Sequence, residues 1–151
     1  MIYLDHHATT PIADEVVVAM AEALKHLSGN PGSVHAAGRA ARAAIDQARR
    51  QVARLVGSRE REVVFTSGGT EANNLALRSG FAAQVAKGRA RIISSTVEHP
   101  SVLNTLADLE RQGAQVVRVG VSSDGALDER AFEEALDDQV GVVSLMWANN
   151  E

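Results

Sequence analysis

Apolar and polar residues follow helical spacing along the first third of the chain. Between residues 13 and 27 apolar side chains recur every three or four positions, which predicts an amphipathic helix. Residues 28–33, with the sequence SGNPGS, concentrate turn-forming residues and predict a loop. A longer helix is predicted at residues 36–56, and Gly57 is positioned to end it.

Beyond Gly57, short apolar runs alternate with helical patterns. Strands are predicted at residues 63–66, 91–95, 115–121 and 140–147, and helices at residues 70–87, 100–112 and 128–136. Strands that alternate with helices are typical of βαβ units, whose right-handed crossovers produce a parallel sheet. The pattern therefore predicts an α/β fold, with a mainly parallel sheet flanked by helices.

The composition of the chain argues against several classes of function. The 151 residues are 45% hydrophobic, enough for one substantial core, and the net charge of -4 disfavours nucleic acid as a partner. The chain has no cysteine, which excludes disulfides and thiolate ligands within it, and no metal site is predicted because the histidines lack partners at ligand spacing. Neither a signal segment nor a membrane-spanning run is present, so we expect a soluble, cytoplasmic protein without membrane contact.

The loops that follow the predicted strands are where ligands gather in open α/β sheets. After residues 63–66 the chain reads SGGTE and then enters a helix. The backbone N–H groups of Gly69 and Thr70, the Thr70 hydroxyl and the helix dipole would all favour an anion there. The turn is thus a candidate phosphate site, and the alternative is an ordinary strand-to-helix turn capped by Thr70.

Two further strand ends carry candidate chemistry. His99 follows the strand at residues 91–95 and could stack on an aromatic cofactor or transfer protons, although a capping or surface histidine is the alternative. Asn149 and Asn150 follow the last strand, where side-chain amides could bind a ligand oxygen or simply form a turn. All these groups would meet at the same edge of the sheet.

Several stretches, taken in order, resemble the N-terminal part of the cysteine desulfurases, in the class V aminotransferase family. They are residues 3–11 (YLDHHATTP), 29–35 (GNPGSVH), 65–74 (FTSGGTEANN), 98–99 (EH) and 149–151 (NNE). The resemblance implies part of the large domain of the pyridoxal 5'-phosphate (PLP) dependent transferase fold type I. Residues 1–12 would belong to the small domain, and residues 13–151 would form an incomplete N-terminal portion of the PLP-binding large domain.

The same resemblance implies a role for each candidate residue. Gly69 and Thr70 would bind the phosphate of PLP, and His99 would stack on the pyridine ring and assist proton transfer as the catalytic residue. Asn150 would bind the phenolic oxygen of PLP and lie near the substrate carboxylate. Residues 8–10 and 30–35 would border the substrate entrance.

The implied reaction converts L-cysteine to L-alanine and passes the sulfur to an enzyme cysteine as a persulfide, for iron-sulfur cluster or thio-cofactor synthesis. A sulfur-acceptor or iron-sulfur scaffold protein would be the partner, and the complete enzyme would be a homodimer.

The departures from the family pattern concern residues that these 151 positions do not contain. The only lysines, Lys25 and Lys87, stand on a predicted helix and at a predicted helix end, where neither resembles the family's cofactor lysine, and the persulfide cysteine is absent. The chain is therefore expected to be inactive alone. Selenocysteine lyase or another class V enzyme is an alternative, as is a noncatalytic truncated module that acts by binding another protein.

Overall fold

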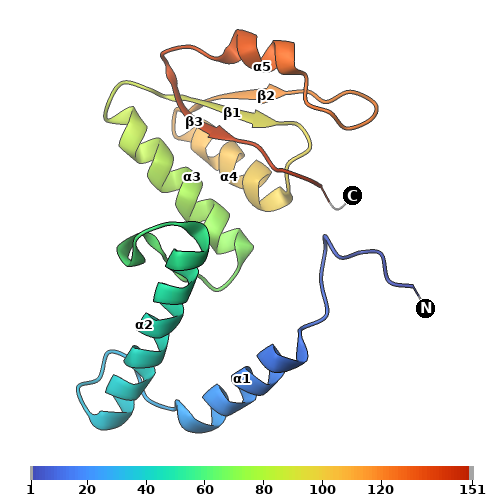
Figure 1. The fold of residues 1–151 in the computed structure, drawn as a ribbon. Helices are drawn as coiled ribbons and strands as arrows, with labels where there is room; N and C mark the ends of the chain where they lie inside the picture. The colour runs from blue at the N-terminus through green and yellow to red at the C-terminus, as the bar shows by residue number, and fades with distance from the viewer. Residues whose placement is uncertain (1, 150–151) are drawn as a thin grey trace. The chain divides into compact units, whose positions relative to one another are not determined.

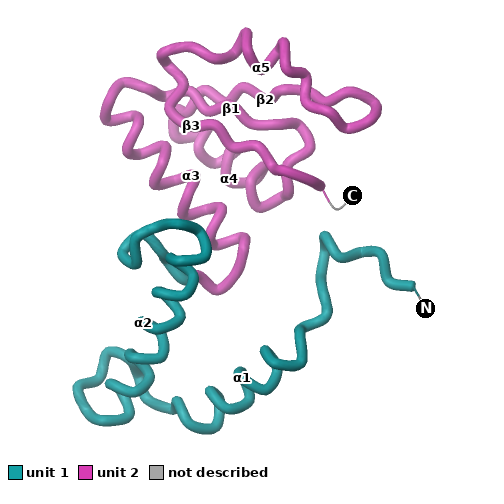
Figure 2. The backbone as a smooth tube through the Cα atoms, in the orientation of Figure 1, with its two compact units in different colours: residues 1–65 teal, residues 66–151 magenta. Residues whose placement is uncertain are grey.

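A computed structural model describes residues 2–149 of the chain. Along the sequence lie α1 (Asp14–His26), α2 (Ala36–Val56), the short 3-10 helix η1 (Glu60–Glu62), α3 (Gly69–Val85), β1 (Arg91–Ser95), α4 (Pro100–Arg111), β2 (Gln115–Val119), α5 (Glu129–Ala135) and β3 (Val140–Ser144) (Figure 1). They divide into two compact units, residues 1–65 and 66–151 (Figure 2). Among the described residues, no helix is both long and apolar enough to cross a membrane.

The first unit is helical and confirms the helices predicted there. The His35 side chain caps α2 by accepting a hydrogen bond at Nδ1 from the Gly38 N–H (3.2 Å). Gly57 ends α2 in the left-handed conformation, with φ 68°, which glycine adopts without strain. A Cβ placed on Gly29 would stand 2.2 Å from the Ala37 carbonyl oxygen, so the loop backbone lies directly on the start of α2.

The second unit is built on a three-stranded parallel sheet in the order β2-β1-β3. The chain runs from β1 through α4 to β2, and then back past β1 through α5 to β3. Because right-handed crossovers that proceed in opposite directions place their helices on opposite faces, α4 and α5 lie on the two sides of the sheet. Figure 1 shows α3 and α4 on one face and α5 on the other.

The core lies between the sheet and the face covered by α3 and α4. Ile92 of β1 and Leu106 of α4 are both completely buried. The surrounding cluster also contains Leu77, Val102, Leu109 and Ala114, with Phe81, Val116 and Val142 packed against it. The buried apolar residues of α4, Val102, Leu106 and Leu109, recur at helical spacing, as expected for a helix that packs one face against a sheet.

The α/β fold is as predicted, but one predicted strand is wrong. Residues 63–66 form no strand within the described part of the chain, and Val64 and Phe65 are exposed. Their composition suits a strand, yet a strand also needs a neighbour to pair with, and residues 63–66 pair with none of the described strands.

Two other predicted strands end earlier than expected. The strand predicted at residues 115–121 ends at Val119, after which Val121 forms an antiparallel bridge with Leu127. The strand predicted at residues 140–147 ends at Ser144. The predicted helix at residues 128–136 is α5, with Asp128 outside it as the N-cap that accepts a hydrogen bond from the Ala131 N–H (2.9 Å).

We predict that Leu106→Ala lowers the free energy of unfolding by about 2 to 5 kcal/mol, because it leaves a cavity in the core beside β1. Leu136→Ala, at a position that is 46% exposed in the same unit, is the control and should cost much less. Urea unfolding followed by circular dichroism measures both. Equal midpoints for the two variants would contradict this placement of the core.

Candidate functional site

The turn before α3 has the open geometry that an anion site requires. Gly68 is the N-cap in an extended conformation, and α3 begins at Gly69. A Cβ placed on either Gly68 or Gly69 would meet no atom within 4 Å, so nothing in the chain crowds the turn. The N–H groups of a first helical turn have no partner within the helix, which leaves those of Gly69 and Thr70 for a ligand.

Ser67, in contrast, is already engaged. Its backbone N–H and its hydroxyl both donate to the Glu71 carboxylate, each at 2.7 Å. These bonds, the backbone one first, hold the pKa of Glu71 below its ordinary value of 4.5. A phosphate at this turn would therefore depend on Gly69 and Thr70.

His99 is the N-cap of α4, as the capping alternative predicts. Its Nδ1 accepts a hydrogen bond from the Ser101 N–H (3.0 Å) and lies 2.8 Å from Ser101 Oγ. The histidine itself remains exposed while this one nitrogen is held. Capping leaves the rest of the ring available, so it is compatible with the predicted contact to a cofactor.

A side chain of α3 links His99 to the candidate phosphate site at residues 67–70, which we call the phosphate turn. Asn73, one turn after Thr70, donates from Nδ2 to Ser101 Oγ (2.8 Å). Thr70 and Ser101 also line one surface depression of about 370 Å³ between α3 and α4. The structure thus brings the phosphate turn and the His99 cap together.

An ion pair farther along the same two helices reinforces this arrangement. Arg78 Nη1 lies 2.6 Å from Asp108 Oδ2. The hydrogen bond from Arg78 is the main reason that the pKa of Asp108 is lowered.

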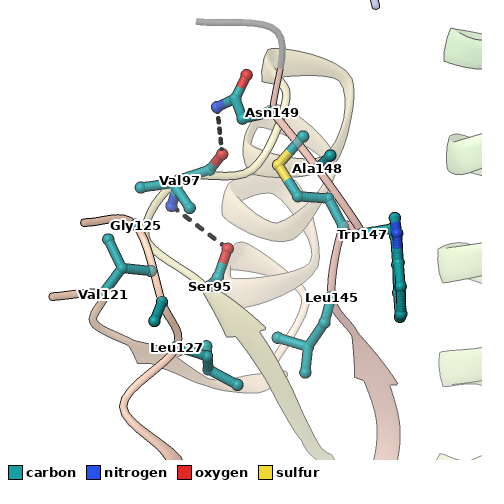
Figure 3. Close-up of a pocket in the computed structure, with 11 residues that line it drawn as sticks. Ser95, Val97, Val121, Gly125, Leu127, Leu145, Trp147, Ala148 and Asn149 are labelled. Carbon is teal, nitrogen blue, oxygen red and sulfur yellow. Dashed lines mark hydrogen bonds between the residues drawn. The ribbon is translucent and has the colours of Figure 1, made fainter.

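The segment after β3 is joined to the loop after β1. The buried Glu98 carboxylate accepts hydrogen bonds at Oε1 from the Met146 N–H (2.8 Å) and the Ser95 hydroxyl (3.0 Å). Asn149 Nδ2 donates to the Val97 carbonyl oxygen at 2.8 Å (Figure 3). The loops predicted to meet at this edge do so, and the predicted site residue Asn150 lies outside the described residues.

A pocket lies at the same edge of the sheet, where β1 leads to α4 on one face and β2 leads to α5 on the other. Its volume is about 600 Å³, and residues after all three strands line it, including Val97, Val121, Leu145 and Trp147 (Figure 3). Neither His99 nor Thr70 is among its lining residues. This apolar pocket is therefore distinct from the phosphate turn.

Sequence reasoning missed several residues that hold the site together. Pro100 at the first helical position marks His99 as the N-cap, so the N–H of Ser101 could have been expected on the His99 ring. No local signal predicts the contact of Glu98 with Met146 or of Asn73 with Ser101, because these partners lie 48 and 28 positions away in the chain.

Residues 2–151 match the family described as aminotransferase class-V, so the chain belongs to that family. It is 49% identical over 152 residues to a cysteine desulfurase of Cereibacter sphaeroides, an alignment that covers 99% of this chain and 39% of that relative. The chain thus spans well under half the length of this relative.

Solved structures of similar proteins have the same fold as the corresponding part of this chain. A NifS-like protein superposes with a TM-score of 0.89 at 35% identity, covering 99% of this chain and 41% of the other. A structure titled SspA in complex with cysteine gives a TM-score of 0.85 at 34% identity, covering 99% and 43%. These likenesses confirm the predicted fold, and the family implies PLP as cofactor.

We predict that carboxyl NMR of the chain will show Glu71 titrating below 4.5, and that Ser67→Ala will raise this midpoint only part of the way, because the backbone N–H still donates. A lowered pKa means that these bonds stabilise the turn above the ordinary pKa, and that this contribution is lost as the pH falls through the lowered value. Ser79→Ala, on the same helix, should not move the midpoint. An ordinary midpoint in the unaltered chain would refute the Ser67–Glu71 contact.

Proposed function

We propose that these residues form the cofactor-side wall of the active site in a PLP-dependent cysteine desulfurase. The observation that carries the proposal is the hydrogen-bonded assembly at one sheet edge, where Asn73 and Ser101 join the phosphate turn to His99. The 49% identity to a cysteine desulfurase and the likeness to a structure titled as a complex with cysteine support the substrate.

The described residues suit the phosphate of PLP. The uncrowded turn at Gly68 and Gly69 leaves room for it, and two N–H groups and the Thr70 hydroxyl are the donors that would bind it. PLP, when bound, supplies an electron sink that stabilises negative charge on the carbon next to the substrate nitrogen.

The remaining roles follow from the family resemblance. The His99 ring would stack on the cofactor and move a proton during the reaction, and Asn150 would donate a hydrogen bond to the phenolic oxygen and lie near the substrate carboxylate. Residues 1–12 would belong to the small domain and residues 13–151 to the large domain of the complete enzyme.

The sulfur chemistry requires groups from outside these 151 residues. L-Cysteine and an enzyme thiol would give L-alanine and an enzyme persulfide, with the sulfur moving from the substrate carbon to the enzyme sulfur. This chain has no cysteine, and its two lysines are Lys25 on α1 and Lys87, which lies just beyond the C-terminal end of α3, whereas the phosphate turn is at the start of that helix. We use the term completed enzyme for this chain together with a polypeptide that supplies the lysine and the cysteine.

Partners and location belong to the same proposal. The persulfide would pass to a sulfur-acceptor or iron-sulfur scaffold protein, and the completed enzyme would act as a cytoplasmic homodimer.

We predict that Thr70→Val in the completed enzyme weakens PLP binding by about 1.5 to 3 kcal/mol, because a hydrogen bond to a charged group is lost. Equilibrium titration with PLP measures the change. Ser79→Ala, which removes a hydroxyl that bonds only within α3, is the control and should leave the affinity unaltered. Unchanged affinity in Thr70→Val would count against the phosphate site.

We also predict that the 151-residue chain alone, given PLP and cysteine, forms no alanine or sulfide above the background, because it lacks a thiol nucleophile. Adding the complementing polypeptide should restore both products. Substantial turnover by the chain alone would overturn the proposal that other residues are needed. Failure of a folded complement to restore activity would favour a noncatalytic module.

A further inference from the structure

One ring nitrogen of His99 is occupied by Ser101. Nδ1 receives the Ser101 N–H at 3.0 Å and lies 2.8 Å from Ser101 Oγ. A backbone N–H can only donate, so Nδ1 is the acceptor, and a hydrogen on Nδ1 would break this bond. The neutral ring in this arrangement therefore bears its hydrogen on Nε2.

The direction of the remaining bonds follows from the same reasoning. The Ser101 hydroxyl has one hydrogen, and it donates that hydrogen to Nδ1. Asn73 must then be the donor in its 2.8 Å contact with Ser101 Oγ, through Nδ2. Hydrogen bonding runs in one direction, from the amide of Asn73 on α3 through the hydroxyl to the His99 ring.

Ser101 is well placed to impose this direction. It is only 7% exposed, and its carbonyl oxygen accepts a hydrogen bond from the Thr105 hydroxyl at 2.8 Å. Water has little access to compete for the Ser101 hydroxyl, and low local polarity strengthens each bond of such a network.

We infer that Ser101, oriented by Asn73, is a positioning residue that fixes His99 in the tautomer with hydrogen on Nε2. In doing so it ties the His99 ring to the helix that begins with the phosphate turn. The inference rests on the proposed function for the chemical role of His99. The tautomer itself follows from this chain's own contacts, and it makes Nε2 a hydrogen-bond donor toward whatever the ring faces.

Two substitutions remove the same bond in different ways. Ser101→Ala deletes the hydroxyl. Asn73→Asp keeps the shape of the side chain but offers only acceptor oxygens, so the Ser101 hydrogen turns to the carboxylate and away from Nδ1. In each variant the Ser101 N–H alone remains on Nδ1.

The test is nitrogen NMR of the completed enzyme with PLP bound and its histidines labelled with 15N, at a pH where the His99 ring is neutral. His99→Gln identifies the His99 signals by their loss. The unaltered enzyme should show hydrogen on Nε2, and both variants should raise the population with hydrogen on Nδ1 roughly five- to tenfold, the expected effect of losing one hydrogen bond. An unchanged ratio in either variant overturns the inference.

Thr105→Val is the matched control, because it removes a buried hydroxyl that bonds to Ser101 but not to His99. It should leave the tautomer ratio unaltered. An equal shift in this control would mean that a general loosening of α4 changes the tautomer ratio of His99, and not the loss of the hydrogen bonds from Asn73 through Ser101. That result would also overturn the inference.

Activity measurements separate this inference from the proposed function. Ser101→Ala should lower kcat roughly tenfold with PLP affinity within about twofold, a smaller loss than the roughly hundredfold expected when a proton-transfer group is removed by His99→Gln. If His99→Gln leaves kcat unchanged, the proposed role of His99 fails. The tautomer ratios still decide the role of Ser101 in that case.

Discussion

Parallel pairing on both sides of β1 is the constraint on which the second unit depends. With β2 and β3 running in the same direction as β1, the segments that leave the three strands emerge at one edge. Burial of Ile92 with Leu106 on one face of β1, and of Ile93 on the opposite face, stabilises the arrangement. A helix that starts within a few residues of the end of β1 must begin at the same edge, which is why His99 lies there.

Buried polar groups make this edge specific. Ser95, Glu98 and Ser101 are each less than one-tenth exposed, and burial would be costly for all of them without hydrogen bonds. Glu98 accepts hydrogen bonds from Ser95 and from Met146, which hold the loop after β1 to the segment after β3. Ser101, near the start of α4, is bonded to Asn73 of α3. In our proposal different elements would bind the ring and the phosphate of PLP, and a rigid edge would then keep the two contacts in register.

The turn proposed to bind an anion is organised by a charged residue of the chain itself. The Glu71 carboxylate accepts hydrogen bonds from the N–H and the hydroxyl of Ser67 and so holds the backbone just before α3. The turn is therefore formed before any ligand binds. The donors of Gly69 and Thr70 then need little rearrangement to bind an anion. The cofactor lysine and the thiol come from elsewhere in our proposal, so these residues contribute binding and orientation, and the covalent chemistry needs a second set of residues.

The sequence by itself determined the helices, the alternating order of elements and the α/β class, because these depend on local spacing and on local caps such as Gly57 and Asp128. It also located the turn at Gly69 and the cap at His99, and the family matches confirmed the family resemblance. Only the tertiary structure decided which segments pair. Residues 63–66 have strand composition without a strand partner, and Glu98 and Asn73 acquire their roles from residues dozens of positions away. Local sequence patterns do not predict such contacts, since a hydrogen bond between distant segments depends on how the whole sheet brings them together.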